Sequence, residues 1–384
     1  MQYNPTVDTR SLYIHWPFCP YKCHFCPFVA LASHDQFMEQ YHNALLSEIE
    51  QFALTYSGTR EIDTLFFGGG TPSTYPDHLL LDTFATLKKH FTFSKQIEVS
   101  IEVNPGTVRT EQLALWKTLG VNRLSIGVQS LKDRVLQQLN RLQSAEQVAS
   151  LLQEAPQHIP NISIDLILGL PGVSPDEWKE LIEKAVTWPI QHISVYFLTV
   201  HEDTPLYFKV TTNRVTLPDD DTMVELYEWT VETLAAHGFE RYELSNFSRP
   251  GYESRHNSVY WQRIPYKAFG LGACSFDGER RFQNEKNLMK YMQHASQASD
   301  LTAFCETLTP EQVHLERLML GLRRRPGVSW QELIAYAPIS KHKIMQDILE
   351  RFEQDKLVQK NNGRYVLTTA GMAVENEIIS QLSK

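Results

Sequence analysis

One stretch near the N-terminus, residues 11–28, reads SLYIHWPFCPYKCHFCPF. Its first six residues are mostly apolar, aromatic or β-branched, which is typical of a buried strand. Three cysteines follow with the spacing CxxxCxxC, at Cys19, Cys23 and Cys26. Prolines on both sides of these cysteines keep the segment from being the interior of a helix. We therefore expect the cysteines on the loop that follows the first strand of a sheet.

Five more β-rich segments follow, each separated from the next by a stretch with helical apolar spacing. The six predicted strands cover residues 11–16, 61–67, 97–103, 121–128, 161–168 and 191–198. Alternating strands and helices predict a parallel sheet wound by right-handed crossovers. Six units are too few for a closed eight-stranded barrel, so we expect an α/β fold, a partial TIM-like (βα)6 barrel open on one side. Chemistry should gather at the carboxyl ends of its strands.

The alternation of predicted strands and helices ends near Asp219. We divide the chain into a barrel, a connecting part with a helix and an aromatic segment, and a C-terminal module: residues 1–218, 219–307 and 308–384. The predicted helices of the module cover residues 310–322, 329–335 and 340–355. A hairpin turning through residues 361–363 should follow. This order predicts a smaller C-terminal α+β region with a winged-helix-like module.

Composition excludes several classes of protein. The chain has 384 residues, of which 42% are hydrophobic, and this suits a globular protein. A net charge of -9 argues against a chain that grips nucleic acid. A DNA-binding regulator built on the C-terminal module is disfavoured too, because residues 310–384 hold 11 Lys and Arg against 9 Asp and Glu. We see neither a signal peptide nor an apolar run long enough for a transmembrane segment, and expect a cytoplasmic protein.

The cysteine loop carries the strongest chemical signal. Three of the five cysteines lie within residues 19–26, and such clustering indicates metal binding rather than a disulfide framework. Three thiolates can ligate three irons of a [4Fe-4S] cubane and leave the fourth iron open to a ligand. A zinc site completed by His15 or His24 is the alternative. Cys274 and Cys305 stand alone and are expected to be small buried residues.

Further polar and glycine-rich positions mark the later strand ends. Gly69, Gly70 and Thr71 follow the second strand, where glycines either form a tight turn or let backbone approach a ligand. The polar residues at the later ends are Glu102, Gln129, Arg141 and Asp165. A carboxylate in an apolar strand is costly unless it is paired. Salt bridges from Glu102 and Asp165 to Arg123 or Arg141 are the structural alternative to a ligand site.

Taken together, these motifs resemble a known family. The matching segments are the CxxxCxxC loop, GGGTP at 68–72, NPG at 104–106, SIGVQS at 125–130, and residues 165–171 and 241–261. Over residues 11–380 the chain resembles the radical SAM proteins related to oxygen-independent coproporphyrinogen III oxidase, and most of all the HemW branch of haem chaperones. The resemblance implies a radical SAM barrel, with S-adenosylmethionine (SAM) at the open iron of a cluster held by Cys19, Cys23 and Cys26. The SAM contacts it implies are Tyr13, Phe25, Gly69, Gly70, Thr71, Glu102, Gln129, Arg141 and Asp165.

Two features distinguish the branches of this family. The oxidases carry a further Cys where this chain has Phe28, and a long arm before the cysteine loop where this chain has 18 residues. Both features favour the chaperone branch. His256 opens the segment HNSVYW, which matches a pattern linked to haem binding in that branch. His256 could ligate haem iron, or it could be a hydrogen-bonded histidine in a packed aromatic corner.

The chain also departs from the family pattern. Pro27 replaces an acidic residue, and Phe276 replaces a histidine. If that histidine binds haem in relatives, haem binding here is weaker or rearranged, and Cys274 becomes an alternative axial thiolate.

The resemblance implies a haem chaperone rather than an enzyme. It would bind haem, a [4Fe-4S] cluster and exchangeable SAM, and would transfer haem to acceptor proteins such as respiratory enzymes. A low-potential electron donor and a homodimer are further implied partners. The alternative is an oxygen-independent coproporphyrinogen III oxidase, which performs radical SAM oxidative decarboxylation in porphyrin biosynthesis.

Overall fold

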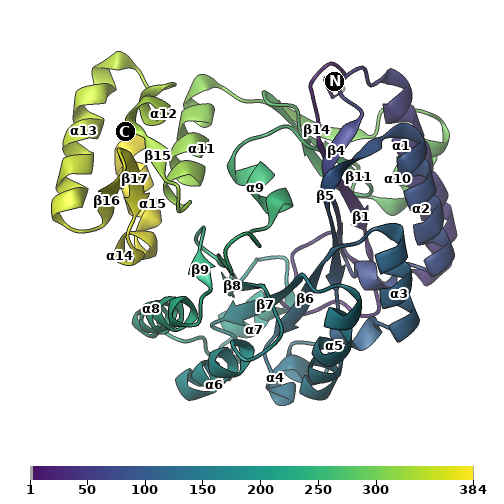
Figure 1. Cartoon of the computed structure of the whole chain (residues 1–384), viewed down its shortest axis with the longest axis horizontal. Helices are drawn as coiled ribbons and strands as arrows, with labels where there is room; N and C mark the ends of the chain where they lie inside the picture. The colour runs from purple at the N-terminus through teal and green to yellow at the C-terminus, as the bar shows by residue number, and fades with distance from the viewer. Residues whose placement is uncertain (1–2, 384) are drawn as a thin grey trace.

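The structure is a computed structural model that describes residues 3–383. Its centre is a nine-stranded sheet with the order β11-β1-β4-β5-β6-β7-β8-β10-β9 (Figure 1). The six predicted strands form the middle of this sheet and pair in parallel. Their bounds are β1 (Ser11–Trp16), β4 (Glu61–Gly69), β5 (Thr92–Val103), β6 (Arg123–Gln129), β7 (Ile162–Leu168) and β8 (His192–Phe197). The order starts at β11 and ends at β9, which confirms the open partial barrel.

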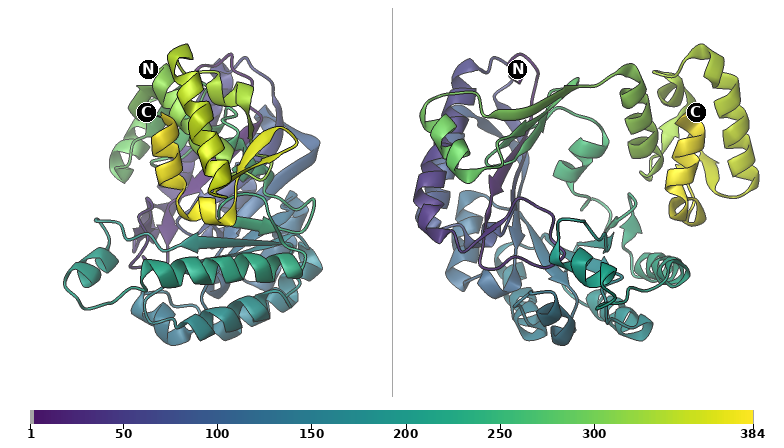
Figure 2. Two further views of the ribbon diagram at one scale, coloured as in Figure 1. Left: turned by 90° about the vertical axis from the view of Figure 1, so that its left-hand side faces the viewer. Right: turned by 180° about the vertical axis from the view of Figure 1, so that it is seen from behind.

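Helices cover the outer face of this sheet (Figure 1). They are α1 (Met38–Thr55), α2 (Asp77–His90), α3 (Thr110–Leu119), α4 (Asp133–Gln138), α5 (Ala145–His158), α6 (Pro175–Ala185) and α8 (Asp220–Ala236). The short helix α7 (Pro205–Thr211) projects beyond the carboxyl end of the strands (Figure 2). Fully buried Leu, Ile and Val side chains from strands and helices fill the space between the layers, for example Ile14, Leu45 and Ile164. Burial of this apolar surface is the main force holding helices to sheet.

The sheet gains three short strands that the sequence did not predict. They are β9 (Glu240–Arg241), β10 (Asn246–Ser248) and β11 (Lys267–Phe269). β11 extends the edge parallel to β1, and β10 pairs antiparallel with β8. A separate three-stranded sheet holds β12 (Cys274–Phe276), β13 (Arg280–Asn284) and β14 (Thr302–Thr307), with α10 (Leu288–Ser296) between the last two. The strands β9, β10 and β11 span only two or three residues, which are too few to show the alternation that identifies a strand.

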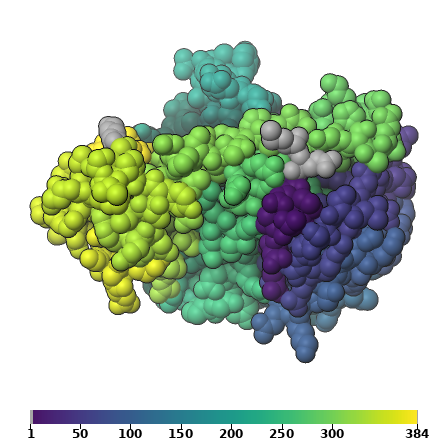
Figure 3. Space-filling view, turned by 90° about the horizontal axis from the view of Figure 1, so that it is seen from above, coloured from purple at the N-terminus to yellow at the C-terminus, as the bar shows by residue number. Residues whose placement is uncertain are grey.

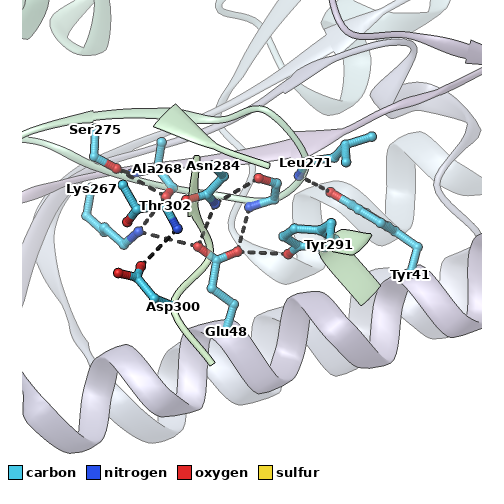
Figure 4. Close-up of polar contacts among 11 residues, drawn as sticks. Tyr41, Glu48, Lys267, Ala268, Leu271, Ser275, Asn284, Tyr291, Asp300 and Thr302 are labelled. Carbon is cyan, nitrogen blue, oxygen red and sulfur yellow. Dashed lines mark hydrogen bonds and ion pairs between the residues drawn. The ribbon is translucent and has the colours of Figure 1, made fainter. Parts of the chain in front are cut away.

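A buried polar cluster fastens the edge strand β11 to helix α1. Figure 4 shows Glu48 of α1 reaching the segment that contains β11 and β13. Its carboxylate accepts hydrogen bonds from Asn284 Nδ2 at 2.8 Å, Tyr291 Oη at 2.8 Å and Gly270 N at 2.8 Å. Lys267 Nζ lies 3.4 Å away and balances the charge. Because a buried carboxylate needs such partners, this cluster fixes the position of the edge.

The inner face of the barrel is polar. Every second residue along the central strands faces inward: Glu98, Ser100 and Glu102 on β5, Arg123 and Ser125 on β6, Ser163 and Asp165 on β7, and His192 and Ser194 on β8. The interior of an ordinary TIM barrel is packed with branched apolar side chains. Here shorter and polar side chains leave room for a cavity.

Residues 242–260, which we call the plug, close the amino end of the barrel. Glu98 accepts hydrogen bonds from the backbone N–H groups of Arg255 and His256, at 3.1 and 2.9 Å, at the start of α9 (Arg255–Trp261). His192 Nε2 lies 2.7 Å from Tyr242 Oη, and Arg123 Nη1 donates to the Tyr252 carbonyl at 3.0 Å. Inward side chains of three strands thus hold the plug.

The C-terminal module forms a lobe at one end of the molecule, as Figures 2 and 3 show. Its elements are α11 (Pro310–Leu322), β15 (Val328–Ser329), α12 (Trp330–Ile334), α13 (Ile339–Gln354), β16 (Val358–Asn361), β17 (Arg364–Leu367), α14 (Thr369–Ala373) and α15 (Glu375–Ser383). It has its own apolar core, which includes Leu318, Leu349 and Ile378. The helices and hairpin agree with the winged-helix-like order. The boundaries at residues 218 and 307 stay predictions.

A buried ion pair joins the module to the plug. Arg323, at the end of α11, places Nη2 3.0 Å from Glu243 Oε2. The other oxygen of Glu243 accepts from Asn246 Nδ2 at 2.6 Å, and Asn246 Oδ1 accepts from Ser194 Oγ at 2.9 Å. These contacts connect the barrel wall to the module through the plug. Among residues 3–383, no helix is long and apolar enough to cross a membrane.

Candidate functional site

A cavity of about 510 Å³ opens at the carboxyl end of the strands. All thirteen site residues predicted from the sequence line it: Tyr13, Cys19, Cys23, Phe25, Cys26, Gly69, Gly70, Thr71, Glu102, Gln129, Arg141, Asp165 and His256. They come from β1 and the loop after it, from β4 to β7 and the turn after β4, from the segment after α4 and from the plug. The sheet therefore brings together residues that lie far apart in the sequence.

The cysteine loop is held in place by backbone contacts at its base and tip. At the base, β2 (Phe18–Cys19) pairs with β3 (Leu31–Ala32), and Leu31 N donates to the Pro17 carbonyl at 2.7 Å. At the tip, His24 N donates to the Leu139 carbonyl at 2.9 Å, while the His24 carbonyl accepts from Leu206 N at 2.9 Å. Cys19 and Cys23 are buried, and Cys26 is half-buried. The loop thus presents its thiols to the cavity from a braced frame.

The surroundings of the thiols suit metal binding. Thr71 Oγ1 donates to Cys19 Sγ at 3.2 Å, and Arg141 Nη1 lies 3.7 Å from Cys23 Sγ. Burial raises the pKa of Cys19 to about 11 and also raises the pKa of Cys26. Without a metal these two thiols are therefore protonated at neutral pH, and metal binding would release their protons. The Arg141 guanidinium would offset part of the resulting negative charge.

Of the two histidines near the loop, His15 has both ring nitrogens engaged, whereas His24 has one engaged nitrogen and lies outside the cavity lining. His15 places Nδ1 3.1 Å from Tyr13 Oη and Nε2 2.8 Å from the Val29 carbonyl oxygen. His24 Nδ1 lies 3.0 Å from the Gln138 carbonyl oxygen. Within the described part of the chain, no three His, Cys, Asp or Glu side chains surround one metal ion. Thiolates that bind a cubane each hold a different iron, so they need a shared space rather than a shared point. The all-sulfur donor set fits an iron–sulfur cluster better than a zinc ion.

The glycine turn after β4 packs against the start of the cysteine loop. Gly69 has φ +119°, and a Cβ there would lie 2.7 Å from the His15 ring. A Cβ on Gly70 would lie 2.5 Å from the Pro17 carbonyl oxygen. Thr71 N also donates to the Phe18 carbonyl at 2.9 Å. The tight-turn interpretation therefore explains the missing side chains, because the space is needed by the protein itself.

Two half-buried carboxyl groups face the same cavity. Glu102 accepts a hydrogen bond from Gly69 N at 3.1 Å, and burial together with the nearby Asp165 raises the pKa of Glu102 to about 8. Asp165 accepts from Ser125 Oγ at 2.8 Å, and burial raises its pKa as well. Among residues 3–383 neither carboxyl group forms an ion pair. Hydroxyl and amide donors thus take the place of the salt bridges to Arg123 or Arg141 that formed the structural alternative.

His256 lies at the junction of cavity and plug and is completely buried. Its Nδ1 is 2.8 Å from Thr64 Oγ1, and its Nε2 is 2.8 Å from Tyr260 Oη. The ring stacks on Phe66 with 5.1 Å between centroids. Burial lowers the pKa of His256 to about 3. This geometry matches the second interpretation of the HNSVYW segment, a hydrogen-bonded histidine in an aromatic corner.

The departures from the family pattern fall in two places. Pro27 and Phe28 line the cavity, and Phe28 is 65% exposed at its mouth. Cys274 lies outside the cavity lining, and its Sγ is 3.3 Å from Gln283 Nε2. Cys274 is exposed and Cys305 is half-buried, so the expectation that both are buried is wrong. Phe276 is buried in the small sheet. The axial thiolate suggested for Cys274 therefore has no support in this geometry.

Several residues that line the cavity were not predicted from the sequence. Ser125 and Ser194 surround Asp165, and Asn104 of the NPG turn donates to Tyr21 Oη at 2.6 Å. The signal that could have found the serines is the alternation of polar residues along β6, β7 and β8. Further missed lining residues are Arg123, His192, Tyr196, Phe197 and His201.

Comparisons with known proteins identify the family of this chain. The model of the radical SAM superfamily matches residues 13–185, and the model of the HemN C-terminal domain matches residues 308–374. The chain is 31% identical to the heme chaperone HemW of Bacillus subtilis, covering 96% of this chain and 98% of the relative. It is 33% identical to a HemW of Synechocystis, covering 87% of this chain and 83% of that one.

A solved structure shares the whole fold. Coproporphyrinogen III oxidase (HemN) from Escherichia coli superposes with a TM-score of 0.83 at 23% identity, covering 100% of this chain and 91% of that chain. At this identity the likeness concerns the fold alone. The HemW relatives, which align over nearly their full length, settle the family. The chain belongs to the HemW heme chaperone family within the radical SAM superfamily.

Proposed function

We propose that this protein is a haem chaperone that binds a [4Fe-4S] cluster with exchangeable SAM, binds haem, and transfers haem to acceptor proteins. One observation carries the proposal. In a chain of the HemW family, a single cavity gathers three thiols, a glycine turn and two half-buried carboxyl groups at the carboxyl ends of parallel strands. Such convergence is where α/β barrels place their ligands.

The cavity residues fall into two groups under this proposal. Cys19, Cys23 and Cys26 would hold three irons as thiolates, with the fourth facing the cavity. The residues that would contact SAM are Tyr13, Phe25, Gly69, Gly70, Thr71, Glu102, Gln129, Arg141 and Asp165. Glu102 is protonated at neutral pH, so its carboxyl group can both donate to and accept from ligand hydroxyl groups. When bound, the cluster would supply an electron of low potential, for which the protein needs an electron donor.

The chaperone role is favoured over the oxidase alternative. Relatives named heme chaperone align with almost the whole chain, whereas the HemN likeness concerns the fold. Phe28 stands where the oxidases carry a further cysteine, and it exposes an apolar ring at the mouth of the cavity. The partners under this proposal are haem-accepting proteins, for which respiratory enzymes are the first candidates. Formation of a homodimer belongs to the same proposal.

A two-arm experiment tests the proposal. The anaerobically reconstituted protein is incubated with haem in one arm and with coproporphyrinogen III, SAM and a low-potential reductant in the other. We expect about one haem per chain, transfer of that haem to an apo-respiratory enzyme, and no decarboxylation above background. Formation of protoporphyrinogen IX would overturn the chaperone role and establish the oxidase. Protein purified without its cluster serves as the control for the second arm.

A further inference from the structure

Three histidines line the cavity, namely His192, His201 and His256. A haem iron needs a ring nitrogen with a free lone pair. His192 cannot offer one without breaking a contact, because Nδ1 lies 2.7 Å from Ser163 Oγ and Nε2 lies 2.7 Å from Tyr242 Oη. Both nitrogens of His256 are engaged in the same way by Thr64 and Tyr260. These two buried rings fasten the plug to the strands.

His201 differs from both. Its side chain is exposed, and within residues 3–383 its ring takes part in no hydrogen bond, ion pair or ring contact. The backbone beneath it is nevertheless fixed. The His201 carbonyl accepts from Thr204 N at 3.1 Å and from Thr204 Oγ1 at 2.6 Å. A free imidazole is thus presented to the cavity from an anchored loop between β8 and α7.

This loop is tied to the cysteine loop. Thr204 caps the start of α7, and Leu206 N in the first turn of that helix donates to the His24 carbonyl at 2.9 Å. His201 and the thiols therefore belong to one braced mouth. A ligand bound through His201 would lie over the same cavity as the cluster.

Aromatic rings accompany His201 at this mouth. Phe28 and Tyr196 line the cavity and are 65% and 40% exposed. The ring of Phe197, on the other face of β8, packs instead against Tyr227, with 5.1 Å between centroids. Exposed apolar surface gathered at one opening marks a binding site for an apolar ligand. Flat rings suit the face of a planar macrocycle.

We propose that His201 is the axial ligand of the haem iron, and that Phe28 and Tyr196 pack against the porphyrin. A lone pair of the His201 imidazole forms the coordinate bond, and no group is transferred in this step. The assignment rests on the proposed function, since it places the ligand of a haem chaperone. It moves the iron contact from the HNSVYW segment to the loop after β8, and it gives His256 a structural role.

Haem titration of reconstituted protein separates these roles. We expect His201→Ala to shift the Soret band and to weaken haem binding by at least about tenfold, with iron and sulfide content unchanged. Added imidazole should restore the band position in this variant. His256→Ala should keep the Soret position of the wild type but lower the melting temperature. His237→Ala, at an exposed histidine outside the cavity lining, should match the wild type in every reading.

The outcomes distinguish the inference from the function on which it rests. An unchanged Soret band and affinity in His201→Ala, while the wild type binds haem, would overturn the ligand assignment and leave the chaperone role intact. Loss of the wild-type spectrum in a folded His256→Ala protein would return the ligand to the plug. Absence of haem binding by the wild type would overturn the proposed function itself and the assignment with it.

Discussion

The two ends of the barrel both contain ionisable side chains, but in opposite conditions. At the carboxyl end, Cys19, Cys26 and Glu102 carry a raised pKa and face a cavity. At the amino end, His192 and His256 have partners on both ring nitrogens. Residue type alone therefore does not distinguish a ligand site from a structural one. What distinguishes them is whether donors and lone pairs are already used by the protein.

The same contrast holds along a single strand. Glu98 and Glu102 face inward from β5, four residues apart. Glu98 accepts two backbone hydrogen bonds from the plug, whereas Glu102 accepts one from Gly69 and faces the cavity. These two carboxyl groups allow the comparison to be tested within one element.

The largest effect is expected at the cysteine loop. Replacing Cys19, Cys23 or Cys26 by Ala should abolish the cluster, because a cubane held by two protein thiolates lacks a required ligand. Iron and sulfide analysis after anaerobic reconstitution should give close to four of each per wild-type chain and almost none per variant. Cys274→Ala and Cys305→Ala are the matched controls and should keep the cluster. Zinc in place of iron after anaerobic purification would contradict this assignment.

A pH-dependent effect follows from Glu102. Its pKa is about 8 in the folded protein and near 4.5 in the unfolded chain. Between these values the folded protein holds a proton that the unfolded chain has lost, so the free energy of unfolding falls as pH rises through this window. The slope reaches up to ~1.4 kcal/mol per pH unit. In Glu102→Gln this contribution should vanish, as measured by urea unfolding of the cluster-free protein from pH 5 to pH 8. An identical slope in variant and wild type would show that Glu102 is charged in the fold.

Glu98→Ala should act on stability and leave the cluster unaffected. It removes the acceptor for two N–H groups at the start of α9, and each unsatisfied buried group costs ~1–3 kcal/mol. Thermal unfolding should show a clear loss of stability, while iron content stays that of the wild type. Lys95→Ala, an exposed position on the same strand, is the control. Cluster loss in a folded Glu98→Ala protein would mean that the two ends of the barrel are not independent.

The smallest effect is expected for Gly69→Ala. The new Cβ would meet the His15 ring and the Trp16 carbonyl oxygen, which forces the cysteine loop to shift at a cost of ~1–3 kcal/mol. Gly120→Ala shares a positive φ of +101° but meets no atom within 4 Å, so it isolates the backbone strain from the clash. Melting temperatures of the two variants give the difference. Equal destabilisation of the two variants would show that the close packing of Gly69 against the cysteine loop does not stabilise that loop.

Much of the fold could be predicted from the sequence because its strands are long. Each of the six central strands spans at least six residues and shows a clear apolar signal. The thiols, Glu102 and Asp165 could be placed together because parallel strands end at one edge. The strands β9 to β11 could not be predicted, since their two or three residues pair with distant segments.

The sequence also could not show which histidines have ring nitrogens that are already hydrogen-bonded. Thr64 lies 192 positions before His256, so no local pattern shows that it occupies Nδ1. His201 carries no motif and stands out only because its ring is free beside the aromatic mouth. The HNSVYW motif points to the segment that forms the plug. It does not show whether a ring nitrogen of His256 has a free lone pair.

The central claim, a cluster with an open iron facing the cavity, is tested most directly by electron paramagnetic resonance. The reduced, reconstituted protein is measured without SAM and with saturating SAM. Cys19, Cys23 and Cys26 leave one iron without a protein ligand, so coordination by the amino and carboxylate groups of SAM should change the spectrum. The account predicts this change in the intact protein. A spectrum unaltered by saturating SAM would contradict it.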